Sequence, residues 1–160
     1  MSITVGDKLP EATFTIMDGG PKQVSASDVF AGKRVALFAV PGAFTPTCSE
    51  HHLPGFIGHA AQLKAKGVDM VACTAVNDVF VLDAWAKTRG VNGLITMLAD
   101  GSAAFAKALG LDVDLGPFGL GVRSKRYAMI VEDGAVKYLA VEDSPPEHSK
   151  ATAEKLLAAL

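Results

Sequence analysis

KRVALFAVPGAFTPTCSEHHLPGFIGHAAQLKAKGVDMVACTAV, residues 33–76, decides the fold of this chain. Its ends, Lys33–Val40 and Gly67–Val76, are short apolar runs rich in β-branched residues, which is typical of strands buried on both faces. Between them, apolar residues recur at helical spacing until a basic turn and a glycine end the run: Leu53, Phe56, Ile57, Ala60 and Leu63. This order predicts a strand–helix–strand unit inside a sheet.

The residues that follow continue the alternation of helices and strands. The expected elements, in chain order, are a helix capped by Asn77 or Asp78 that ends near Gly90, a strand at Leu94–Ala99, a short helix at Ser102–Leu109 and a long surface loop at Gly110–Gly121. Strands that alternate with helices in this way predict right-handed crossovers and helices on the faces of the sheet.

The end of the chain has a different pattern, because Asp133-Gly134 is a dipeptide preferred by two-residue hairpin turns. It joins Arg126–Glu132 to Ala135–Val141, which predicts an antiparallel pair, and Ser149–Leu160 predicts a final helix. The whole order predicts an α/β fold with a mixed central β-sheet flanked by helices on both faces, as in the thioredoxin-like architecture. Without a repeat or a linker, we expect a single domain over residues 1–160.

Composition narrows the class of protein. The 160 residues are 49% hydrophobic, which suffices for one ordinary core. The formal net charge is -2 without a basic cluster, so no nucleic acid partner is expected. The longest apolar stretch, Val35–Val40, is too short to cross a membrane, and Met1–Pro10 lacks the layout of a signal peptide. We therefore expect a soluble, cytoplasmic protein whose two cysteines serve packing or chemistry.

Cys48 lies between the first strand and the helix after it. Thr45 followed by Pro46 is typical of an N-cap with proline at the first helical position. Alternatively, Thr47 and Glu50 match the capping box. Either register puts Cys48 in the first helical turn, where unpaired backbone N–H groups and the helix dipole stabilise a thiolate. We therefore expect Cys48 to be ionised at neutral pH.

Both cysteines also have a plain explanation as small buried hydrophobes. For Cys48 the chemical explanation is favoured, because its neighbours are polar and packing does not require a cysteine at a helix start. For Cys73 packing is favoured, because Val71–Thr74 has the composition of a buried strand.

The spacing Pro41-x-x-x-Thr45-x-x-Cys48 resembles the signature of the peroxiredoxins. Together with His52–Phe56, it is similar to the type II, peroxiredoxin-five-like group of that family. The similarity continues through nearly the whole chain, at residues 64–68, 76–78, 98–100 and 125–127.

That resemblance implies a thiol-dependent peroxidase acting on hydrogen peroxide and organic hydroperoxides. Cys48 would be the peroxidatic nucleophile, Thr45 would hydrogen-bond the peroxide and the thiolate, Pro41 would shield the pocket, and Arg126 would stabilise the thiolate and polarise the peroxide. The resemblance further implies an antioxidant enzyme of cell redox homeostasis that uses no cofactor and no metal. A homodimer is implied as well, packed through apolar surface near Phe44 and Phe80.

The chemistry favours an arginine independently, because attack on a peroxide places negative charge on the departing oxygen. A guanidinium stays charged and donates to two oxygens at once. Arg123 and Lys125 are nearby alternatives to Arg126, and all three could be an ordinary solvated cluster. The family motif favours Arg126, which directly precedes the aromatic Tyr127.

Around this centre we expect a substrate pocket lined by Phe44, Thr47, Leu115, Phe118 and Leu120, although loop packing explains the last three equally well. His51 and His52 follow Cys48 closely enough to suggest a metal site, but the run supplies too few ligands to favour one. We expect His52 to make structural hydrogen bonds instead.

Turnover requires a thiol that reduces the sulfenic acid formed at Cys48. Cys73 follows Cys48 by 25 positions, the spacing of a second cysteine in plant-like type II members, and no cysteine follows Cys73. A strand cysteine cannot bridge to Cys48 if their Cα atoms are more than about 7 Å apart. Cys73 is therefore only a possible resolving residue. We expect a one-cysteine cycle in which glutathione, glutaredoxin or thioredoxin regenerates Cys48.

Three other functions compete with this interpretation. A catalytically inert binding or chaperone module would not need the combination of Thr45, Cys48 and Arg126. A thioredoxin-type oxidoreductase would need C-x-x-C, which the chain lacks. A thiol protease or acyltransferase would need a general base beside Cys48, for which His51 or His52 is the available residue.

Overall fold

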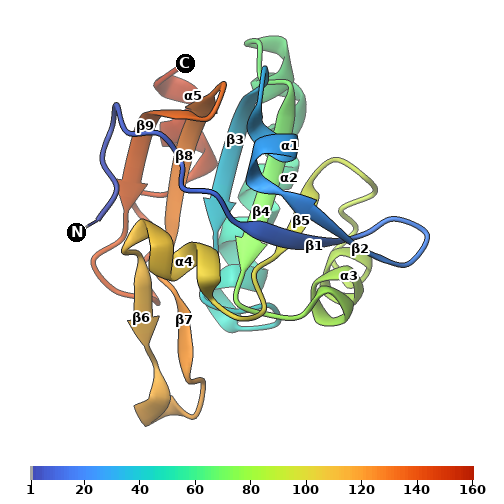
Figure 1. The fold of residues 1–160 in the computed structure, drawn as a ribbon, viewed down its shortest axis with the longest axis vertical. Coiled ribbons are helices and arrows are strands. Elements are labelled where there is room, and N and C mark those ends of the chain that lie inside the picture. Colours follow the sequence, from blue (N-terminus) through green and yellow to red (C-terminus); the bar gives the residue numbers. More distant parts are fainter. Residues whose placement is uncertain (1) are drawn as a thin grey trace.

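A seven-stranded mixed sheet forms the centre of the computed structural model, which describes residues 2–160 (Figure 1). The strand order is β2-β1-β5-β4-β3-β8-β9. The strands are β1 Thr13–Met17, β2 Pro21–Ser25, β3 Arg34–Ala39, β4 Met70–Ala75, β5 Thr96–Ala99, β8 Tyr127–Glu132 and β9 Ala135–Val141. The helices are α1 Ala26–Phe30, α2 Leu53–Ala65, α3 Val79–Thr88, α4 Ala104–Leu109 and α5 Ala153–Ala158.

Helices cover both faces of this sheet, so the predicted α/β, thioredoxin-like architecture is confirmed. Alternate residues of β3 point to opposite faces, as a strand requires. Phe38 belongs to the core that α2, α3 and α5 complete, whereas Leu37 belongs to the core completed by α1 and α4. Every residue from Val35 to Ala39 is buried, which explains the uninterrupted apolar run in the sequence.

The predicted strand–helix–strand unit is confirmed as β3–α2–β4, with β3 and β4 parallel and Phe38 opposite Cys73. The hairpin at the end of the chain is also confirmed, because β8 and β9 pair antiparallel. Asp133 and Gly134 both have positive φ, as the tight turn requires. β8 additionally pairs antiparallel with β3, which places Tyr127 opposite Ala39.

Two expectations from the sequence need correction, and one segment has elements that were not predicted. Gly110–Gly121 is not a plain loop: it contains β6 Asp112–Asp114 and the 3-10 turn η2 Gly116–Phe118, and β6 pairs with β7 Val122–Ser124 in a hairpin that projects from the body (Figure 1). Residues 13–30, for which no elements were predicted, form β1, β2 and α1. The final helix begins at Ala153, later than expected, because the Thr152 hydroxyl caps it.

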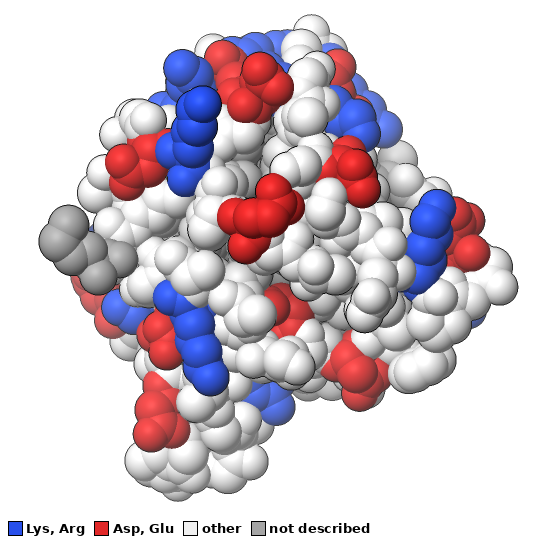
Figure 2. Space-filling view, viewed as in Figure 1, with Lys and Arg blue, Asp and Glu red and all other residues white. Residues whose placement is uncertain are grey.

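Charged side chains are dispersed over one face of the molecule. On the face seen in Figure 2, basic and acidic groups alternate over a largely uncharged background. Within residues 2–160, no helix has the length and apolarity needed to cross a membrane.

Candidate active site

The helix that carries Cys48 begins as the Thr45-Pro46 pattern predicted, with Thr45 as the N-cap. Pro46 is the first helical residue, and the Thr45 carbonyl accepts the N–H of Ser49 at 3.0 Å. The alternative capping box is wrong, because Thr47 already has helical φ and ψ and its hydroxyl donates to the Pro146 carbonyl at 3.1 Å. Cys48 therefore lies in the first helical turn, as expected.

A tight turn precedes this helix. The Thr45 hydroxyl and N–H both donate to the Gly42 carbonyl, at 2.6 and 3.3 Å. Phe44 has φ +65°, a left-handed conformation that is unusual for a bulky side chain. Such strain persists only where surrounding contacts fix it. One of these contacts is the Ala43 N–H, which donates to Asn77 Oδ1 at 2.9 Å.

Cys48 itself begins a π-helical turn, η1 (Cys48–His52), which leads directly into α2. Its carbonyl accepts the N–H of Leu53, five residues later. Turns of this kind are rare and are often found at functional sites. The turn is held against α3, because the Trp85 indole N–H donates to the buried Ser49 hydroxyl at 2.9 Å.

Arg126 contacts the sulfur of Cys48 directly. Its Nη2 donates to Cys48 Sγ at 3.1 Å, and both side chains are buried, with 2% of Arg126 and none of Cys48 exposed. Nε and Nη2 also donate to the Pro145 carbonyl, at 3.1 and 3.0 Å. The remaining terminal nitrogen, Nη1, lies 2.9 Å from His52 Nδ1.

His52 is a neutral partner of this guanidinium. Its Nε2 lies 2.8 Å from the Ala151 carbonyl and therefore carries the proton, which leaves Nδ1 as the acceptor for Arg126. Burial, followed by the positive charge of Arg126 and the neighbouring His148, holds the pKa of His52 well below its ordinary value of 6.5. The expected structural role of His52 is thus joined by a direct contact with Arg126.

This arrangement leaves the buried cation one contacting side chain that is able to become anionic, Cys48. Among residues 2–160, every ion pair involves other residues, so no carboxylate neutralises Arg126. A buried charge is stable only when it is paired and hydrogen-bonded. A thiolate at Cys48 supplies that pairing, and the same guanidinium can donate to an oxygen that approaches the sulfur.

Arg123, one of the two alternatives to Arg126, contacts the turn before Cys48 and not its sulfur. Arg123 donates from Nε to the Leu120 carbonyl at 2.8 Å and from Nη1 to the Pro41 carbonyl at 3.4 Å. A Cβ on Gly42 would lie 2.9 Å from the same Nη1, so glycine leaves room for this contact. Arg123 therefore connects the projecting hairpin to the turn before Cys48.

The expected pocket residues fall into two groups. Pro41, Phe44, Thr45 and Thr47 surround the start of the helix, and Phe44 is exposed. Leu115, Phe118 and Leu120 belong to the β6–β7 hairpin, where Leu115 is buried and Phe118 is 78% exposed. The two groups are connected through the contacts of Arg123.

Cys73 lies in β4 with its thiol free and fully buried, in the same apolar cluster as Cys48. Burial raises the pKa of the Cys73 thiol well above its ordinary value, and Cys48 raises it further. The thiol form, a poor nucleophile, is therefore strongly favoured at Cys73.

Metal-ligating groups are already engaged in other contacts. Both ring nitrogens of His52 are hydrogen-bonded, and Cys48 contacts Arg126. Among residues 2–160, no group of three or more histidine, cysteine or acidic side chains is arranged to hold a metal.

Sequence patterns did not identify the residues of segment 143–151 that hold Arg126 in place. Pro145 and Ala151 act through backbone carbonyls, which leave no signature in side-chain patterns. The one available signal was Pro145-Pro146, a stiff dipeptide without N–H donors.

Comparisons with known proteins identify the family to which this fold and sequence are similar. The Redoxin family model matches residues 4–157. The chain is 49% identical to "Peroxiredoxin-2E, chloroplastic" of Arabidopsis thaliana over 99% of this chain and 70% of that protein. It is 48% identical to "Peroxiredoxin-2C" of Oryza sativa subsp. japonica over 99% and 98%. The solved structure of reduced Prx3 with H2O2 from Vibrio vulnificus gives a TM-score of 0.93 at 52% identity, covering 98% of this chain and 95% of that one.

The neutral His52 predicts a pH dependence of stability. Below about pH 6.5 the unfolded chain protonates this histidine whereas the folded chain does not, so the free energy of unfolding decreases as pH falls. Uptake of this one proton on unfolding changes the free energy of unfolding by up to ~1.4 kcal/mol per pH unit. Urea unfolding of wild type and His52→Gln between pH 7 and 5 should show a shallower slope in the variant. Parallel curves would contradict a neutral, buried His52.

Proposed function

Because this chain belongs to the peroxiredoxins of the Redoxin family and is a thiol-dependent peroxidase of the type II group, we propose that Cys48 is its peroxidatic residue and Arg126 its activating cation. The observation that carries the proposal is the 3.1 Å contact between Arg126 Nη2 and Cys48 Sγ. Hydrogen peroxide and organic hydroperoxides are the proposed substrates.

In the proposed reaction, the Cys48 thiolate attacks one peroxide oxygen. An S–O bond forms while the O–O bond breaks; the attacked oxygen keeps its hydrogen, and the departing oxygen takes a proton from the solvent to leave as water or an alcohol. The product at Cys48 is sulfenic acid. The peroxide is reduced by two electrons and the sulfur is oxidised by two, so the step needs no metal or organic cofactor.

Three further groups are proposed to assist. Arg126 donates to the peroxide oxygens, where negative charge grows in the transition state. Thr45 uses its proton on the Gly42 carbonyl, so its hydroxyl oxygen is available to accept a hydrogen bond from the peroxide. Pro41 has no N–H donor and shields the sulfur from water on the side of the preceding turn.

The proposed pocket is lined by residues of the helix start and of the projecting hairpin: Phe44, Thr47, Leu115, Phe118 and Leu120. The exposed ring of Phe118 offers apolar surface to the carbon chain of an organic hydroperoxide. Hydrogen peroxide has no such chain, so we propose that these residues discriminate among substrates without taking part in the cleavage of the O–O bond.

Regeneration is proposed to use an external thiol. Glutathione, glutaredoxin or thioredoxin attacks the sulfenic acid and releases water, and a second thiol reduces the resulting mixed disulfide. A cycle that consumes these thiols suits a reducing compartment, of which the cytoplasm is our proposal. Cys73 takes no part in this cycle, because its raised pKa leaves it protonated.

A homodimer is also proposed. Phe44 and Phe80 are 51% and 63% exposed. Apolar surface exposed in this way often marks a protein–protein interface. The bond between the Ala43 N–H and Asn77 holds together the segments that carry them. We propose that a second copy covers this surface, which borders the start of the Cys48 helix.

Replacement of Cys48 by serine tests the peroxidase centre. With dithiothreitol as the reductant, wild type should consume hydrogen peroxide rapidly and Cys48→Ser should not, because a hydroxyl remains protonated and is a weak nucleophile. Mass spectrometry should detect sulfenic acid at Cys48 of wild type. Equal inactivity of two folded proteins would remove Cys48 from its assigned role.

Replacement of Cys73 by serine tests the one-cysteine cycle. Turnover with glutathione and glutaredoxin, or with thioredoxin, should stay within about twofold of wild type, because the external thiol reacts at Cys48. The measurement is the steady-state rate of peroxide reduction with each reductant. A thioredoxin-dependent rate that disappears in Cys73→Ser would make Cys73 the resolving cysteine.

A charge at Phe80 tests the dimer. Phe80→Glu should shift micromolar protein from dimer to monomer in sedimentation equilibrium, because the interface would bury an unpaired carboxylate. Val5→Glu, a charge at another exposed apolar position, should leave the dimer intact. A wild type that sediments as a monomer would contradict the proposed homodimer.

A further inference from the structure

Glu142 and Arg126 are neighbours across the end of the β8–β9 hairpin. The pair Tyr127 and Val141 is the last in the strand register, and beyond it the Glu142 N–H donates to the Arg126 carbonyl at 3.0 Å. The carboxylate of Glu142 is thus the acidic side chain that the sheet register places beside the cation. It does not form an ion pair with Arg126, since no ion pair of Glu142 occurs within residues 2–160.

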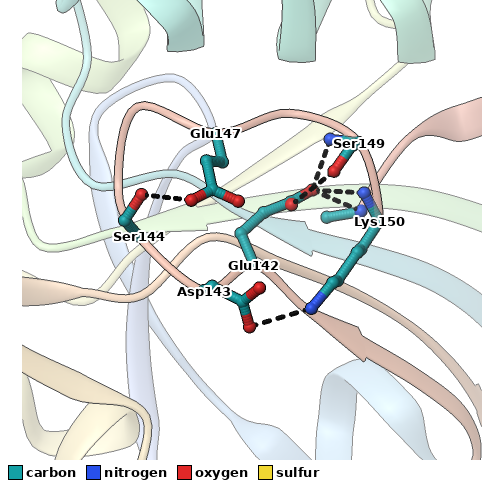
Figure 3. Close-up of polar contacts among 7 residues, drawn as sticks. Glu142, Asp143, Ser144, Glu147, Ser149 and Lys150 are labelled. Atoms are coloured by element: carbon teal, nitrogen blue, oxygen red, sulfur yellow. Dashed lines mark hydrogen bonds and ion pairs between the residues drawn. The ribbon is translucent and has the colours of Figure 1, made fainter.

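The carboxylate instead closes the segment that follows it. Glu142 Oε2 accepts the backbone N–H groups of Ser149, Lys150 and Ala151 at 2.9, 2.7 and 2.6 Å, and Oε1 accepts the Ser149 hydroxyl at 3.4 Å (Figure 3). Only 4% of Glu142 is exposed. Burial alone would raise the pKa of this carboxyl, but the three N–H groups outweigh it and hold the pKa below the ordinary value.

The closed segment, residues 142–151, forms a loop that reaches the guanidinium at two points. The Pro145 carbonyl accepts from Nε and Nη2 of Arg126, and the Ala151 carbonyl contacts His52, whose other nitrogen contacts Nη1. The three guanidinium nitrogens are therefore held by this loop directly or through one histidine. Besides Arg126 itself, the contact from outside the loop that lies nearest to the Pro145 carbonyl is the exposed hydrogen bond from the Thr47 hydroxyl to the Pro146 carbonyl at 3.1 Å, so the buried bonds of Glu142 are the main restraint on the far end of the loop.

The other polar contacts within the loop lie at its surface. Asp143 pairs with Lys150 at 2.8 Å between largely exposed side chains, and Ser144 donates to Glu147 at 2.8 Å (Figure 3). Exposed contacts of this kind contribute little to stability. The buried bonds of Glu142 are charge-assisted and well shielded from water, so they dominate the conformation of the loop.

We propose that Glu142 is a positioning residue of the peroxidase: by closing the loop 142–151 it holds the Pro145 and Ala151 carbonyls so that Arg126 points at Cys48. This inference rests on the proposed role of Arg126 and deepens it. The choice of partners of the Glu142 carboxylate matters as much as its position. A Glu142 that paired with Arg126 would neutralise the charge that the thiolate and the peroxide require, whereas a Glu142 bound to backbone N–H groups leaves that charge available.

A double-mutant cycle tests the proposal. The measured quantity is the second-order rate constant for oxidation of Cys48 by hydrogen peroxide, obtained by quenched flow and mass spectrometry. Glu142→Ala should lower it at least tenfold, because the loop no longer holds the guanidinium. In an Arg126→Lys background the same change should cost less than twofold, since a residue that acts through Arg126 has no further effect once the guanidinium is gone.

Asp143→Ala is the matched control, because it removes a neighbouring loop carboxylate that contacts only Lys150, and it should leave the rate constant within twofold. If Glu142→Ala does not fold, Glu142→Gln carries the cycle. Its amide oxygen can still accept from the backbone, so we expect a smaller loss with the same dependence on Arg126.

The outcomes separate the two levels of inference. A Glu142 variant that reacts as fast as wild type, or that loses the same factor in both backgrounds, would overturn the positioning role and leave the peroxidase proposal intact. An Arg126→Lys variant as fast as wild type would instead remove the proposed role of Arg126, and the positioning role with it.

Discussion

The contact between the guanidinium of Arg126 and the sulfur of Cys48 is the interaction on which the rest of the site depends. A buried arginine retains its charge, because its guanidinium does not give up its proton in proteins. Arg126 is 2% exposed and its other partners, the Pro145 carbonyl and the neutral His52, are uncharged. The sulfur of Cys48 is therefore the one hydrogen-bond partner of this buried cation that is able to carry a negative charge.

The topology of the sheet brings these two residues together from positions 78 apart in the sequence. β3 ends at Ala39 and leads into the turn before Cys48. β8 lies antiparallel beside β3, so its first residue, Tyr127, is opposite Ala39. Arg126 directly precedes β8 and therefore lies at the end of the strands where β3 leads into the Cys48 helix. A parallel β8 would place Arg126 at the opposite end of the strands, so the antiparallel pairing of β8 with β3 is what allows Arg126 to contact Cys48.

Sequence reasoning succeeded where a pattern has a local cause. The apolar run Val35–Val40, the Asp133-Gly134 turn and the Thr45-Pro46 helix start each follow from short-range sterics or hydrogen bonding, and each lies where it was expected. The β6–β7 hairpin was missed because its strands are three residues long, too short for a period to emerge. Arg126 was chosen through a family motif, since no local pattern distinguishes it from Arg123.

The supporting contacts could not be predicted for a related reason. Glu142 looks like an ordinary polar residue in the sequence. Structural hydrogen bonds were expected of His52, but its partners Arg126 and Ala151 could not be named, because only the folded chain brings them together. The π-helical turn at Cys48 is likewise invisible, because its sequence is equally compatible with an α-helix. Long-range polar contacts between backbone and side chain are the part of a structure that residue patterns record least.

The two cysteines differ in one polar contact. Cys48 and Cys73 are both free, both fully buried, and both members of the same apolar cluster. Burial by itself favours the neutral thiol, and that is the outcome at Cys73, whose pKa is raised. Cys48 differs in having a guanidinium nitrogen 3.1 Å from its sulfur and a helix start around it. Since both thiols are fully buried, the contact with Arg126 is the feature that distinguishes Cys48 from Cys73, and it is the basis of the proposed role of Cys48.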